Sequence, residues 1–273
     1  AYHDGQDGAA KLLRLGRRDD PFIPSLIYLD RTGELLIGDE AEEMIDDDPR
    51  GVVRGLKRKL RDRYIRCNGQ KRAPVDLLQS VFSYLRDRAS NEIPQFKGVA
   101  ASDVVLTYPG DYGPPEEQIL RDAAQAAGFL RVRLIDEPSA ACLAWREMSG
   151  VHDEALVVLD CGGGTADWAC LTLQDGSYRL EPRCPPGGDR QVGGEDVDAE
   201  LLSLVQDYID RIEDQDERNR LTEEFDEKQT PLLRQLCRLK ERYSRRGRLL
   251  ASDQPRLGGR TIEIMREEIE AIL

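Results

Sequence analysis

A chain of 273 residues is long enough to bury a substantial hydrophobic core, either as one large domain or as two lobes. Its composition, 40% apolar and 33% charged, is that of an ordinary soluble protein, and its net charge of −13 argues against nonspecific binding to nucleic acids or anionic membranes. Its sequence has no apolar run of membrane-spanning length, and its six cysteines form no C-x-x-C pair, which argues against a zinc site and favours a reducing cytoplasm.

The first half of the sequence predicts alternating strands and helices. Apolar runs on either side of the turn Asp30–Gly33 favour an antiparallel hairpin. Pro114 and Pro115, followed by two glutamates, are typical of a helix start, and Gly128 is typical of the residue after a helix end. In chain order, the predicted elements are strands at 26–29 and 34–37, helices over 39–45 and about 52–64, an amphipathic helix from Pro74, a short buried strand at 104–107, a helix from Pro114 to Gly128, a strand at 132–135 and a helix opened by Pro138.

The pattern restarts near residue 155 with three apolar strands, separated first by a glycine-rich turn and then by the turn Asp175-Gly176. From Asp196 onward the sequence is mostly helical, and residues 210–228 are so highly charged that we expect them to face solvent. Alternating strands and helices on both sides of Gly150 indicate an α/β protein of two lobes, with a nucleotide bound between them.

Residues 157–173 carry the most informative motif, an apolar strand, the turn Gly162–Thr165 and a second apolar strand, with Asp160 and Asp167 at the two ends of the turn. Glycine permits a tight turn and the close approach of a ligand, and successive N–H groups in such a turn suit a phosphate. Because carboxylates repel phosphate, the two acids favour a divalent cation between them, and magnesium prefers oxygen ligands. The alternative is a glycine-rich hairpin with solvated aspartates.

This motif is not a P-loop, because no G-x-x-x-x-G-K-[ST] occurs and the glycines join two strands. It resembles the phosphate loop of the actin-like ATPase superfamily and, within it, the seventy-kilodalton heat-shock (DnaK-like) chaperones. Three further segments carry the narrower resemblance, in the family's order: Val104–Pro109 followed by Ala123–Gly128, Leu134–Trp145 with its Glu-Pro-Ser-Ala-Ala helix entry, and Gly187–Asp198 with its Gly-Gly-Glu-Asp loop.

The resemblance implies an α/β, two-lobed actin-like ATPase fold with ribonuclease-H-like lobes, truncated at both ends. Residues 1–150 would form the first lobe of a nucleotide-binding domain, without the family's first phosphate loop. Residues 151–273 would form the second lobe, including a helical subdomain. The implied cofactors are ATP or ADP with Mg²⁺, and the fragment alone is expected to be weakly active or inactive.

The resemblance also assigns roles to individual residues. The phosphates are expected against two loops, at Gly162, Gly163, Gly164, Thr165, Gly193, Gly194 and Glu195. Magnesium is expected, held through water, near Asp160, Glu137 and Asp167, and these acids form the implied catalytic set with Lys57 and Thr165. Adenosine contacts are implied for Lys240 and Ser244. From the residues alone, Glu137 also fits an acid at a helix N-terminus, and Lys57 also fits a surface lysine.

Two positions depart from the family's pattern. Cys237 stands where an acid is expected, three residues before Lys240, and Glu117 stands where an arginine used in signalling between domains is expected. The preferred function is ATP binding and slow hydrolysis by a divergent heat-shock-type chaperone, which acts on client proteins or with co-chaperones and binds neither nucleic acid nor membrane. A nucleotide-sensing scaffold without hydrolysis and a small-molecule kinase of the same superfamily are the alternatives. The absence of a G-x-G-x-x-G that opens a helix argues against a Rossmann dehydrogenase.

Overall fold

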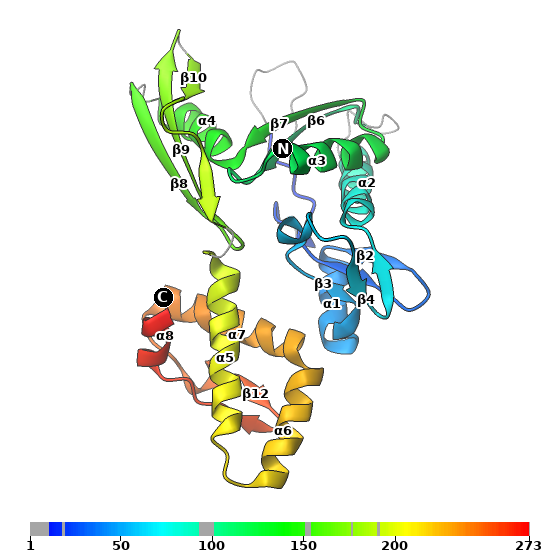
Figure 1. Ribbon diagram of the computed structural model, residues 1–273, viewed down its shortest axis with the longest axis vertical. Coiled ribbons are helices and arrows are strands. Elements are labelled where there is room, and N and C mark those ends of the chain that lie inside the picture. The colour runs from blue at the N-terminus through cyan, green and yellow to red at the C-terminus, as the bar shows by residue number, and fades with distance from the viewer. Residues whose placement is uncertain are drawn as a thin grey trace. The chain divides into compact units, whose positions relative to one another are not determined.

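The protein is a mixed α/β chain, shown as a computed structural model in Figure 1. The structure describes residues 11–17, 20–92, 101–150, 154–175, 177–189 and 192–272. Two compact units make up the chain, Ala1–Met44 with Arg50–Arg190 and Ile45–Pro49 with Gln191–Leu273. The boundary between lobes near Gly150 stays a prediction.

The first strands form a small antiparallel sheet. In this sheet β1 (Ile27–Leu29) lies between β2 (Leu35–Ile37) and β3 (Val52–Val53). The carboxylate of Asp30 accepts hydrogen bonds from the N–H groups of the turn that follows, and Gly33 adopts a left-handed φ of 97°, which glycine tolerates best. The predicted hairpin is therefore confirmed, as is the helix after it, α1 (Asp39–Asp47).

The predicted helix over 52–64 is wrong. Val52 and Val53 pair with β1, and only a short 3-10 helix, Leu56–Lys59, follows. Gly55 precedes it with a left-handed φ of 61°, a conformation that interrupts a continuous right-handed helix. The chain then forms a hairpin of β4 (Ile65–Cys67) and β5 (Gln70–Arg72).

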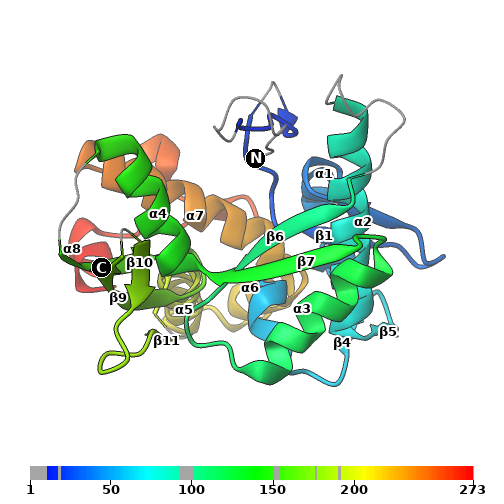
Figure 2. The same cartoon turned by 90° about the horizontal axis from the view of Figure 1, so that it is seen from above.

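A parallel strand–helix–strand unit follows the long helix α2 (Pro74–Glu92). Strands β6 (Asp103–Tyr108) and β7 (Arg131–Asp136) are parallel neighbours, joined by α3 (Pro114–Ala126), which packs against α2 and β7 (Figure 2). Each of these elements matches a prediction. However, β6 is half-buried instead of buried, because its residues alternate between exposed and partly covered positions.

A second sheet follows α4 (Glu137–Ser149). Its central strand is β9 (Ala166–Gln174), which pairs with β8 (Ala155–Cys161) along one edge and with β10 (Ser177–Leu180) and then β11 (Gly187–Asp189) along the other. All these pairs are antiparallel, and they confirm the predicted succession of strand, glycine turn, strand and strand. Gly176, in the second predicted turn, lies outside the described residues.

The second unit is mainly helical, as predicted. It contains α5 (Gly194–Asp210), α6 (Gln215–Glu227), α7 (Gln229–Arg246) and α8 (Arg266–Ile272), with a small hairpin of β12 (Arg256–Leu257) and β13 (Arg260–Thr261). Its core is formed by apolar side chains from all four helices, among them Leu201, Leu221, Leu236 and Ile269. The charged segment predicted to face solvent is mostly α6, of which only Leu221 and Phe225 are buried.

No helix within the described ranges is long and apolar enough to cross a membrane.

Candidate functional site

The glycine turn connects two paired strands, with one acid on each strand. Asp160 of β8 lies directly opposite Asp167 of β9, and the next pair, Cys161 and Ala166, closes the ladder before the turn. Within the turn the N–H of Gly162 donates to the carbonyl of Thr165 over 2.8 Å. Directly opposed residues of an antiparallel pair share a face of the sheet, where like charges destabilise each other. This arrangement therefore favours a cation beside the two carboxylates.

The glycines of the turn are placed for access to a ligand. Gly162 and Gly163 are exposed and do not use the left-handed conformation. A side chain at Gly163 would meet no heavy atom within 4 Å. The backbone conformation does not require glycine at these two positions. A side chain there would instead reduce the access of a ligand to the turn.

Asp167 is the most firmly held acid of the site. Its side chain is buried, with the residue only 1% exposed. One carboxylate oxygen, Oδ1, accepts a hydrogen bond of 2.8 Å from the N–H of Gly110, in the loop after β6. The other oxygen, Oδ2, accepts one of 2.6 Å from the hydroxyl of Thr165. A buried carboxylate needs such donors, and here they fix its orientation.

The absence of a side chain at Gly188 leaves space for the carboxylate of Asp167. Gly188 lies opposite Asp167 on β11, and a Cβ atom added to it would collide with Oδ1 of that carboxylate. Sequence analysis missed both Gly188 and Gly110. The adjacent glycines at 187 and 188 were a signal of close backbone approach, but nothing in the sequence indicated that the approach is to Asp167.

The 3-10 helix Leu56–Lys59 contacts both the glycine turn and the start of α4. The ammonium of Lys57 forms an ion pair with the carboxylate of Glu137, the first residue of α4. The guanidinium Nε of the next residue, Arg58, donates to the carbonyl of Gly164 over 2.6 Å. The hydroxyl of Tyr112 donates to the carbonyl of Lys57 over 2.8 Å and secures the helix. Arg58 is thus a further contact of the turn, to which sequence analysis gave no role.

The remaining predicted residues belong to the second unit. Gly193 and Gly194 begin α5, Glu195 lies in its first turn, and Ser244 is exposed on α7. The ammonium of Lys240 lies 2.7 Å from Oδ1 of Asp198 and donates to the carbonyl of Gly194 over 2.6 Å.

Cys237 shares the acid that binds Lys240. Its thiol donates to Oδ2 of Asp198 over 3.0 Å. The neutral thiol leaves the acid available to the lysine, whereas an acid at position 237 would compete with Asp198 for that lysine.

The side chains around the turn suit a magnesium ion that keeps its bound waters better than a metal ion coordinated only by protein atoms. Both oxygens of Asp167 already accept hydrogen bonds, and Glu137 is paired with Lys57. The described residues contain no group of three or more histidine, cysteine, aspartate or glutamate side chains that could hold a metal. Asp160 is half-exposed beside the turn. Magnesium keeps several waters and needs only one or two carboxylates when phosphates supply the rest, so these residues fit it.

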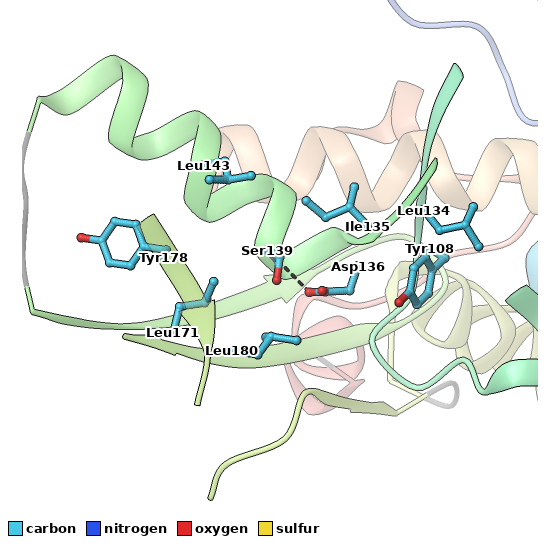
Figure 3. A pocket seen from close by; sticks show the side chains of 9 residues that line it. All are labelled: Tyr108, Leu134, Ile135, Asp136, Ser139, Leu143, Leu171, Tyr178 and Leu180. Atoms are coloured by element: carbon cyan, nitrogen blue, oxygen red, sulfur yellow. Dashed lines mark hydrogen bonds between the residues drawn. The ribbon is translucent and has the colours of Figure 1, made fainter. Parts of the chain in front are cut away.

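A pocket of about 250 Å³ lies in the first unit, between residues of β6, β7, α4, β9 and β10 (Figure 3). Its lining is mostly aliphatic and aromatic: Tyr108, Leu134, Ile135, Asp136, Ser139, Leu143, Leu171, Tyr178 and Leu180. Burial, followed by the carboxylates of Glu117 and Asp136, raises the pKa of the Tyr108 phenol. The Asp136 carboxylate accepts from the N–H of Ser139 over 2.8 Å and caps α4. None of the predicted nucleotide-binding residues lines this pocket.

Comparison with protein families gives a match over more than half of the chain. The model described as "Hsp70 protein" matches residues 35–240. The chain belongs to the Hsp70 family. The predicted resemblance to the heat-shock chaperones is thereby confirmed, and every predicted site residue except Ser244 lies within the matched Hsp70 range.

Curated relatives of this Hsp70 chain include proteins named "Chaperone protein DnaK" from several organisms. That of Cenarchaeum symbiosum is 28% identical over 186 residues, which is 68% of this chain and 27% of the relative. That of Endomicrobium trichonymphae is 27% identical over 199 residues, 72% of this chain and 31% of the relative. That of Nitrosopumilus maritimus is 28% identical over 192 residues, 70% of this chain and 29% of the relative. The matched part of the chain thus spans less than a third of these relatives.

Proposed function

We propose that this chain is part of a nucleotide-binding domain that binds magnesium-ATP and contributes to its slow hydrolysis in a molecular chaperone. The proposal includes a two-lobed actin-like fold with ribonuclease-H-like lobes at 1–150 and 151–273. Its main support is the hairpin turn between β8 and β9, where opposed Asp160 and Asp167 flank exposed glycine amides. The Hsp70 family match and the DnaK relatives support the same class of activity.

The residues of the turn would bind phosphate and position the metal. The amides of Gly163, Gly164 and Thr165 would donate to the phosphates, while the N–H of Gly162, bonded to the Thr165 carbonyl, would hold the turn in shape beside them. Asp160 would bind magnesium through water, and Asp167, fixed by its two donors, would orient that water. Bound magnesium would supply charge neutralisation on the phosphates, which is the main requirement of phosphoryl transfer.

Lys57 would act beside the transferred phosphate. Its side chain is 62% exposed while paired with Glu137, so the ammonium can approach a ligand without first leaving a buried position. Glu137 would hold it in place and would also orient water at the metal. Within the second unit, the Gly193, Gly194 and Glu195 loop would contact phosphate, and Lys240 and Ser244 would contact adenosine. The parent protein would use its nucleotide state to control clients or co-chaperones, in a reducing cytoplasm that suits its six free cysteines.

Single-turnover hydrolysis of magnesium-ATP by the full-length parent protein tests this function. We expect Lys57→Ala to slow hydrolysis by about 100-fold, because a cation that stabilises transition-state charge contributes on that order. Lys59→Ala, on the same 3-10 helix, is the matched control and should keep the rate. Equal rates for the Lys57→Ala and parent proteins would remove Lys57 from the mechanism. Tight ATP binding by the parent without hydrolysis would indicate a nucleotide sensor instead.

Gly188→Ala should also impair turnover. The added methyl group would displace the Asp167 carboxylate from the N–H of Gly110, and misplacement by about 1 Å costs up to roughly 100-fold in rate. Gly113→Ala serves as the control, because a Cβ at that position makes only ordinary contacts, with the nearest atom 3.6 Å away. The test compares the rates of magnesium-ATP hydrolysis of the two variants with that of the parent protein. A parental rate in the Gly188→Ala protein would contradict the role of Asp167.

A further inference from the structure

Two cysteines outside the proposed nucleotide site lie in contact. The sulfur of Cys170, in the middle of β9, is 2.7 Å from that of Cys184, in the loop between β10 and β11. Backbone hydrogen bonds create this contact. The N–H of Glu181 donates to the carbonyl of Cys170 over 2.8 Å, and the N–H of Cys184 donates to the carbonyl of Glu181 over 2.9 Å. The chain therefore continues the sheet at Glu181 and then turns back toward β9.

The two thiols are close enough to bond and open enough to react. A disulfide has an S–S length of about 2.05 Å, so less than about 1 Å of movement would form it. Both residues are free cysteines of intermediate exposure, which leaves them accessible to a small oxidant. The hydrogen bond with Cys184, then burial and the nearby Glu181 carboxylate, raise the pKa of the Cys170 thiol. At neutral pH this favours a resting dithiol.

The other cysteines differ from this pair. Cys67 and Cys142 are buried. The thiol of Cys237 donates to Asp198 in the second unit. Cys161 is exposed beside the glycine turn and has no contact with this pair among the described hydrogen bonds.

We propose that Cys170 and Cys184 form a redox site that closes into a reversible disulfide on exposure to hydrogen peroxide. The thiolate of one cysteine attacks a peroxide oxygen, the O–O bond breaks, and a sulfenic acid and one water are formed. The second sulfur attacks the sulfenic sulfur, the S–O bond breaks, and a second water leaves with the remaining thiol proton. Two electrons pass from the sulfurs to the peroxide. A dithiol reductant reverses the change and itself becomes a disulfide.

The disulfide would fasten the segment between β10 and β11 to the central strand. Three residues beyond Cys184, the chain enters β11, which pairs with β9 at Trp168, Asp167 and Ala166. Fixing this segment would hinder the separation of β11 from β9. An effect on nucleotide turnover through Asp167 would rest on the function proposed above, whereas formation of the disulfide itself does not.

The test is peptide mapping of the purified protein after treatment with hydrogen peroxide. Trypsin without reductant releases Cys184 in peptide 184–190 and Cys170 in peptide 147–179, which also contains Cys161. The experiment therefore uses the Cys161→Ser variant, in which Cys170 is the only cysteine of the longer peptide. We expect most of peptide 184–190 to become linked to peptide 147–179, and dithiothreitol to separate them. Cys184→Ser and Cys184→Ala in the same background should abolish the link, with circular dichroism to check folding.

Some results would overturn the proposal. Sulfinic or sulfonic acid at Cys170 and Cys184 without a linked peptide would show that the pair does not close. Hydrogen exchange at the amides of Gly187, Gly188 and Asp189 should slow by about tenfold or more on oxidation, as expected for a cross-link across a short loop. Unchanged exchange would refute the fastening of β11. Neither the peptide link nor the exchange rates depend on whether the protein hydrolyses ATP. The redox proposal and the proposed function can therefore fail independently of each other.

Discussion

The Asp160→Asn protein is expected to lose magnesium-dependent ATP turnover by about 100-fold or more while it keeps its fold. Asp160 lies opposite the buried Asp167 and beside the exposed glycine turn. Because Asp167 is buried and Asp160 is half-exposed, Asp160 is the more accessible of the two acids to a hydrated cation. Asparagine preserves the shape of the side chain and removes its charge. Relief of the repulsion between the two opposed acids should make the variant at least as stable as the parent.

Single-turnover hydrolysis in the full-length protein, measured across a range of magnesium concentrations, checks this prediction. Asp175→Asn is the matched control. It removes one negative charge just after β9, the strand that pairs with β8, at a residue with φ of 51°, a conformation that asparagine also tolerates. Both variants lose one negative charge, so a difference in their turnover must come from the local role of Asp160. Full turnover by the Asp160→Asn protein at every magnesium concentration would refute the proposed metal site.

Leu236→Ala is expected to destabilise the second unit by about 2–5 kcal/mol, the usual cost of a cavity in a packed core. Leu236 lies on α7, is 0% exposed, and belongs to the core built from all four helices of that unit. A loss of this size is a large fraction of the stability of a typical domain, which is about 5–15 kcal/mol. Urea denaturation followed by circular dichroism measures it.

Arg245→Ala provides the comparison on the same helix. Its side chain is 80% exposed, and its guanidinium lies 4.0 Å from the carboxylate of Glu241. We expect a change within about 0.5 kcal/mol, because alanine suits a helix and an exposed ion pair contributes little. Equal losses in the free energy of unfolding for the two variants would contradict the packing of Leu236, and not of Arg245, in the core.

Periodicity and turn residues predicted most elements of the fold. Pro74 and Pro114 begin helices where expected, and the strands around Gly162–Thr165 pair as expected. The failure at 52–64 has a local cause. Charged and apolar residues there have helical spacing, but Gly55 adopts a left-handed conformation and Val53 pairs with Ile27. Tertiary pairing outweighed a weak helical pattern.

The candidate site was only partly predictable, because a motif reveals neighbours along the chain and not across it. The turn and its two acids were recognisable from residues 157–173. The bond from Gly110 to Asp167 joins residues 57 positions apart, and that from Arg58 to Gly164 joins residues 106 positions apart. Neither glycine nor arginine carries a sequence signal for such a partner. Long-range packing decides these contacts.

The donor that fixes Asp167 from the loop after β6 is a main-chain group, and this affects how the site can change during evolution. Most mutations replace side chains and leave the amide of residue 110 in place, so single substitutions rarely delete this hydrogen bond outright. Proline is the exception, because it has no N–H. Larger residues act indirectly, since a Cβ at position 110 would approach the Gly187 carbonyl to 3.1 Å. A main-chain donor therefore makes this contact of Asp167 less sensitive to the identity of residue 110 than a side-chain donor would.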